Sequence, residues 1–131
     1  MYLLDTNPLI YAFKGQGRYR ERIEATDPAL LHLSTLSLFE IEFGLTRSLN
    51  PQPMRQYVED ACRRHVCLPF DVAGAIEAGK LRQLLNKAGT PIGNYDLLMA
   101  GIALARKMTF VTRNVREFSR VPGLHVEDWY D

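Results

Sequence analysis

The first seven residues, MYLLDTN, constrain the fold of this chain more than any other stretch. The apolar run from Tyr2 to Leu4 has no polar alternation and stops at Asp5, which predicts a short strand buried on both faces. Such strands belong to parallel sheets covered by helices, where ligands bind beyond the carboxyl ends of the strands. Asp5 is therefore expected at a binding edge. The alternative is that Asp5 and Asn7 only turn the chain and cap a helix beginning near Pro8.

Further apolar runs of strand length alternate with helical sequence along the chain. We predict strands at 30–34, 66–70 and 109–112, and an edge strand at 124–129 that contains Trp129 as a packing residue. The predicted helices cover 8–13, 18–25, 37–49, 54–64, 72–88 and 95–106, with a short one ending at 118. This order predicts one domain over residues 1–131, a three-layer α/β/α sandwich with a mostly parallel sheet of four to five strands.

Polar side chains collect where these strands end or where the following helices begin. The candidates on this rim are Asp5, Glu40, Asp96 and Asn114. Three carboxylates brought within ~5 Å of one another repel by roughly 3 kcal/mol per pair at an effective dielectric near 20. Such a cluster requires raised pKa values or a cation, and oxygen ligands suit Mg²⁺ or Mn²⁺. The pattern therefore indicates metal-dependent phosphodiester hydrolysis.

Each candidate also has a structural interpretation. Ser37 and Glu40 have the spacing of a capping box, although Glu40 also shares a helix face with Gly44, where another backbone could approach. Asp96 falls in the first turn of a helix with Asn94 as its expected N-cap, so its charge would stabilise the positive helix end. Asn114 forms a second capping-box pair with a glutamate three residues later. Spacing alone leaves these alternatives open.

Several motifs in order resemble PIN-domain ribonucleases of the toxin type found in VapBC toxin–antitoxin pairs. The resemblance runs nearly the whole length. The motifs are LLDTN at the start, SLFEIEFG at 37–44, PIGNYDLLMAGIAL at 91–104, VTRNVREF at 111–118 and VPGLHVEDW at the end.

The resemblance implies a fold, an activity and partners. Asp5, Glu40 and Asp96 match the family's three principal acidic metal ligands, and Asn114 stands where many members have a fourth acid. Thr6 and Thr112 match hydroxyl positions beside the metal site. The family implies a Mg²⁺- or Mn²⁺-dependent endoribonuclease acting on tRNA or another structured RNA loop. It also implies a homodimer and a cognate VapB-like antitoxin.

Net charge and composition exclude fewer functions than the motifs do. The net charge is +1, because 16 basic residues offset 15 acidic ones, so RNA binding would depend on local clusters. Candidates for the approach to the acidic pocket are Lys14, Arg18, Arg47, Arg113 and Arg116. Two cysteines without a second pair fit neither a zinc site nor a disulfide framework. The three isolated histidines are expected to be structural. No apolar run reaches the ~18 residues of a membrane span, so we expect a cytoplasmic protein.

Rival classes lack the residues that they need. A phosphatase using Asp5 as nucleophile, as in haloacid dehalogenase-like proteins, needs an acid two residues later, where Asn7 stands. A receiver domain keeps paired acids near its first strand and is phosphorylated on an aspartate after its third. Neither G-x-G-x-x-G nor a P-loop lysine motif is present. The remaining alternative is a non-catalytic PIN-like module that binds RNA or protein.

Overall fold

A five-stranded parallel sheet forms the centre of the protein in the computed structural model, which describes residues 1–131. The strands are β1 (Tyr2–Leu4), β2 (Leu31–Ser34), β3 (Val66–Leu68), β4 (Thr109–Val111) and β5 (Val126–Glu127). Their order is β3-β2-β1-β4-β5, and every neighbouring pair is parallel. The predicted α/β class and sheet are confirmed, although the strands at 66–70 and 109–112 end earlier than expected.

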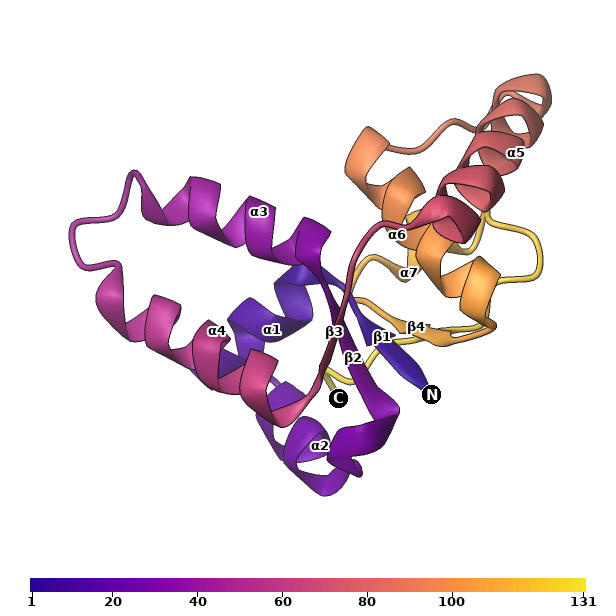
Figure 1. The fold of residues 1–131 in the computed structure, drawn as a ribbon. Helices are drawn as coiled ribbons and strands as arrows, with labels where there is room; N and C mark the ends of the chain where they lie inside the picture. Colours follow the sequence, from indigo (N-terminus) through magenta and orange to yellow (C-terminus); the bar gives the residue numbers. More distant parts are fainter.

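Helices cover both faces of this sheet (Figure 1). One layer contains α1 (Thr6–Lys14), α2 (Tyr19–Ala25), α3 (Thr35–Leu45) and α4 (Gln52–Arg64), with a short 3₁₀ turn at Pro28–Leu30. The other contains α5 (Val72–Ala88), α6 (Asn94–Arg106) and α7 (Val115–Phe118). None of these helices is long and apolar enough to cross a membrane.

Alternate residues of each central strand point into two separate cores. Leu3 and Phe110 pack under α5 and α6, whereas Leu4 and Val111 pack under α1 and α2. Trp129 joins the second core with 2% of its surface exposed, so its predicted packing role is confirmed. Burial on both faces explains why these strands are continuous apolar runs.

Helix α6 lies directly against α5 because of small residues. A Cβ added to Gly101 would lie 2.7 Å from the Gly74 carbonyl oxygen and 2.7 Å from the Ala78 Cβ. Only glycine permits this approach of the two backbones. The contact fixes the start of α6, and with it Asp96, relative to the rest of the layer.

Several helix starts differ from the predictions. Helix α1 begins at Thr6, two residues before Pro8. Ser34, not Ser37, caps α3, because its Oγ accepts from the Leu36 N–H at 3.0 Å. The predicted Ser37–Glu40 capping box is therefore wrong, and both side chains are free for tertiary contacts. Helix α6 has Gly93, not Asn94, as its N-cap. Helix α4 begins at Gln52, because Pro53 fits the first helical turn, where its missing N–H costs nothing.

Candidate active site

The acidic site lies beyond the carboxyl ends of β1 and β4. The chain winds from β1 to β2 and β3 on one side, then returns to β4 and β5 on the other, so strand order reverses between β1 and β4. Crevices at such switch points are the usual binding sites of parallel sheets. Asp5 follows β1 directly and Thr112 follows β4, so backbone topology alone brings these two side chains to one edge.

Asp5 is held by two donors. Its Oδ1 accepts from the Thr6 N–H and its Oδ2 accepts from the Thr112 hydroxyl, both at 2.8 Å. Asp5 is also the N-cap of α1, as the capping interpretation predicted, and this is compatible with a role in the site. Asn7 is not a cap, because α1 begins at Thr6 and contains it. Burial raises the pKa of Asp5, and the nearby Glu40 and Glu117 carboxylates add to the effect, although both hydrogen bonds oppose it.

Glu40 reaches the same site from α3. The Thr6 hydroxyl donates to Glu40 Oε1 at 2.7 Å and lies 3.0 Å from the Ser37 Oγ. Thr6 therefore links Asp5, through its N–H, to Glu40, through its hydroxyl. Ser37 is 1% exposed and belongs to this network, a role that its sequence position did not indicate.

Asp96 forms the other half of the site together with Glu117 of α7. Their carboxyl groups share a hydrogen bond. Burial, that bond and the charges of Asp5, Glu117 and Glu40 raise the pKa of Asp96 from 3.8 to about 7. The pKa of Glu117 is lowered, chiefly because its Oε1 accepts from the Gly93 N–H. The opposite shifts of the two pKa values favour the proton on Asp96 over Glu117.

Glu117 is the acid of the candidate site that the sequence analysis did not place there. It had been assigned to a capping box with Asn114, but the Asn114 amide instead donates to Glu117 Oε2 at 3.0 Å. Asn114 thus orients an acid three residues further on, so a fourth carboxylate is present after all. The signal was available, because α7 follows a strand that ends at the same sheet edge as β1.

The four acids fit a hard divalent cation by their chemistry. All the donors are carboxylate oxygens, which Mg²⁺ and Mn²⁺ prefer. Burial is the main cause of the raised pKa values of Asp5 and Asp96, and the charges of neighbouring carboxylates add to it. As the side chains stand, however, no three acidic, histidine or cysteine side chains lie close enough together to hold one ion. The acids therefore form two pairs, and not a ready-made chelate.

The predicted RNA-binding side chains differ in whether they already have a partner within the protein. Lys14 and Arg116 are exposed and make no ion pair or hydrogen bond. Arg18 pairs with Glu21 at 3.0 Å, and Arg113 pairs with Asp128 at 2.8 Å. Arg47 lies over the Phe43 ring, 4.6 Å from its centroid. The first two are the better placed to meet a phosphate.

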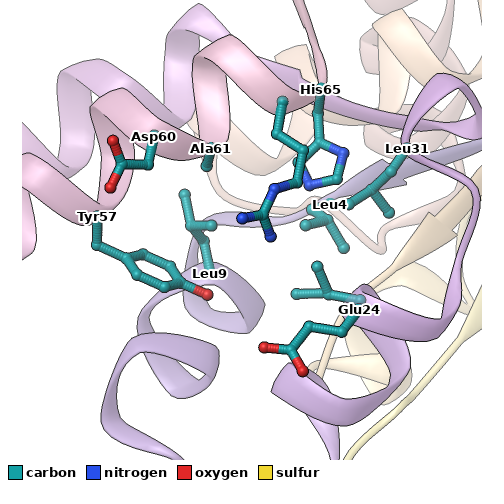
Figure 2. A pocket seen from close by; sticks show the side chains of 10 residues that line it. Leu4, Leu9, Glu24, Leu31, Tyr57, Asp60, Ala61 and His65 are labelled. Carbon is teal, nitrogen blue, oxygen red and sulfur yellow. The ribbon is translucent and has the colours of Figure 1, made fainter.

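A separate cavity lies between α1, α2 and α4 (Figure 2). It measures about 160 Å³, with Leu4, Leu9 and Leu31 in its wall and Glu24 and His65 among its polar residues. None of the four acids lines it. The buried His65 side chain has a hydrogen-bond partner within the fold, because its Nδ1 lies 3.3 Å from the Pro28 carbonyl oxygen. His32 likewise lies against two backbone carbonyls, so two of the three histidines are structural, as predicted.

The family model described as PIN domain matches residues 2–124. The chain belongs to the PIN-domain family. It is 37% identical over 129 residues to the tRNA(fMet)-specific endonuclease VapC of Salmonella typhimurium, covering 98% of this chain and 97% of that protein. Ribonuclease VapC2 of Rickettsia felis is 32% identical over 131 residues, covering 98% of each chain.

Solved structures agree with this assignment. The crystal structure of DNA-bound VapBC from Salmonella typhimurium superposes with a TM-score of 0.89 at 37% identity, covering 98% of this chain and 97% of that one. The predicted resemblance to VapC-type PIN-domain ribonucleases is therefore confirmed.

Proposed function

We propose that this PIN-domain protein is a metal-dependent endoribonuclease that acts as the toxin of a toxin–antitoxin pair. The observation that carries the proposal is the gathering of Asp5, Glu40, Asp96 and Glu117 at the switch point of the sheet. Relatives named as VapC ribonucleases support the same activity. The substrate that we expect is an exposed single strand, such as a tRNA loop, because its splayed backbone can reach a recessed site.

Asp5, Glu40, Asp96 and Glu117 would supply the ligand oxygens for Mg²⁺ or Mn²⁺ once their side chains move closer together, because no three of them now lie close enough to hold one ion. When bound, such an ion polarises the scissile phosphate and stabilises the developing charge on the leaving oxygen. The chain's own contribution is orientation. Thr112 and the Thr6 N–H hold both oxygens of Asp5, the Thr6 hydroxyl holds Glu40, and Asn114 with the Gly93 N–H holds Glu117. Asp96 must lose the proton that it shares with Glu117 before it can serve as an anionic ligand.

The partner that we propose is a VapB-like antitoxin, since the solved relatives are VapBC complexes. A toxin acting on tRNA works in the cytoplasm, and an antitoxin restrains it there. We also propose a homodimer. Exposed apolar side chains on neighbouring helices support it, namely Phe39 on α3, Val72 and Ile76 on α5, and Tyr95 on α6. Size-exclusion chromatography with light scattering tests this state.

The proposed activity is tested with purified protein and bulk tRNA. Cleavage is expected with Mg²⁺, is expected to stop in EDTA, and is expected to be lost in Asp5→Asn. Glu42→Gln is the matched control, because Glu42 is an exposed acid of α3 that pairs with Arg55 of α4 at 2.6 Å and not with the acidic site. RNA that is bound tightly but never cut would instead identify a non-catalytic binding module.

A further inference from the structure

A groove of about 410 Å³ opens beside the acidic site, between α1, α3 and the start of α4. This volume lies within the roughly 300–1,000 Å³ that is typical of ligand pockets. Its apolar lining is Ile10, Phe13, Ile41, Leu45 and Met54. Glu40 also lines the groove while accepting the Thr6 hydroxyl bond in the acidic site, so the two share a wall. The cavity of Figure 2, by contrast, has no acid of the site in its wall.

The polar residues of the groove suit a nucleotide. Lys14 lines it, is exposed and has no ion pair, so its ammonium is available to a phosphate. Ser48 and Asn50 add hydrogen-bonding groups. Phe13 packs edge-to-face against Tyr57, with ring centroids 5.5 Å apart, which holds its ring as part of the wall. An aromatic and apolar wall beside one cation is the combination that binds single-stranded nucleic acid.

Resting on the proposed nuclease function, we propose that this groove binds the nucleotide next to the scissile phosphate of a single-stranded RNA. A strand with one phosphate at the acids carries the neighbouring nucleotide past Glu40 and into the adjoining hollow. The base contacts Phe13 and the apolar wall, and Lys14 binds the backbone phosphate. The groove therefore contributes to the choice of the bond that is cut.

Gly44 provides a way to close the groove without disturbing the fold. It lies on the groove wall in α3, and a Cβ added there would meet no atom within 4 Å. Gly44→Leu should therefore fill the groove while α3 stays intact. Gly79 on α5 is exposed and has the same free space, but it does not line the groove. Gly79→Leu is the matched control.

The experiment measures the affinity of a fluorescent, single-stranded RNA of mixed sequence in EDTA, and KM for its cleavage in Mg²⁺. Gly44→Leu is expected to weaken binding and raise KM by at least about tenfold, the size expected for losing one base contact. Gly79→Leu should match the parent, and all three proteins should melt alike. Hydrolysis of bis-p-nitrophenyl phosphate, which has no flanking nucleotide, should be equal in all three.

Two results would overturn the inference. Unchanged RNA affinity and KM in Gly44→Leu would show that the groove receives something other than RNA, such as a protein segment. Equal loss on RNA and on the small phosphodiester would mean that the substitution acts through Glu40. If the parent binds RNA through the groove but cleaves neither substrate, the proposed activity fails, and the groove is an RNA-binding site with no scissile phosphate beside it.

Discussion

The two halves of the acidic site are held in opposite ways. Asp5 and Glu40 accept hydrogen bonds from neutral donors, namely the Thr6 N–H and the hydroxyls of Thr6 and Thr112. Asp96 instead shares a hydrogen bond with another acid, Glu117, and its pKa is raised to about 7. Burial alone does not explain the contrast, because Asp5 is the more deeply buried of the two aspartates.

This difference shows which half of the site depends on a counter-charge. Two donors from the fold offset part of the burial that raises the pKa of Asp5, whereas Asp96 has no such donors. Asp96 and Glu117 avoid repulsion by keeping a proton between them. A divalent ion would replace that proton, so metal affinity should rise with pH as Asp96 ionises. We therefore expect metal affinity and folding stability to depend on pH mainly through Asp96 and Glu117.

The largest expected effect is the loss of cleavage in Asp96→Asn. If Asp96 fixes the ion, removing its charge should cost at least about a hundredfold in rate, or about 2.7 kcal/mol. Initial rates on tRNA in saturating Mg²⁺ measure this effect. A rate within about threefold of the parent would remove Asp96 from the site. Glu117→Gln in the same assay should show a smaller loss, since Glu117 is the more exposed member of the pair.

The next effect is on stability and separates the two halves directly. Between about pH 4 and pH 7 the unfolded chain ionises Asp96 while the native protein keeps its proton, so stability falls as pH rises. Because Asp96 is only half buried, solvent screening reduces this effect to about 2 kcal/mol. The Asp96→Asn variant has no ionisable group at this position, so this pH dependence is absent from it. The free energy of unfolding of the parent minus that of the variant should therefore fall by about this amount from pH 4 to pH 8.

This measurement is made by denaturant unfolding in EDTA. The difference in unfolding free energy between parent and variant is used because other groups also titrate. Burial lowers the pKa of His65, so the stability that His65 contributes is lost as pH falls. Glu117 also has a lowered pKa, and its contribution is lost at lower pH. His65 is unchanged in both proteins, so its contribution cancels in the difference. Glu117 contacts Asp96, so the difference reports the titration of that pair. A variant clearly less stable than the parent at pH 7 would favour the role of Asp96 in stabilising the helix end.

The smallest expected effect concerns the hydroxyl-held half. Thr112→Val removes the donor to Asp5 Oδ2 and the acceptor of the Asn114 N–H, and Thr112 is fully buried. We expect a loss of about 1 to 2 kcal/mol in unfolding free energy at pH 7. Thr109→Val, at the start of the strand that Thr112 follows, is the control, because the Thr109 hydroxyl makes no hydrogen bond. Equal stability of the two variants would mean that donors do not stabilise Asp5.

Local pattern was sufficient for much of the architecture. The apolar run before Asp5 predicted β1, and the helix predicted at 72–88 is α5, which Asp71 caps by accepting from the Gly74 N–H. Helix starts were less accurate where two polar residues lay near each other. Ser34 and Ser37 both have the chemistry of a cap, and only the register of β2 with its neighbours decides which one ends the strand.

The sequence by itself determined that acids would follow β1 and begin α6, because strand length, helix spacing and capping preferences act over a few residues. Only the tertiary structure decided how those acids pair. The contact of Asp96 with Glu117 depends on how α7 packs over the start of α6, and the bond of Thr6 to Glu40 joins residues 34 positions apart. Such contacts depend on packing between distant segments, which no local pattern encodes.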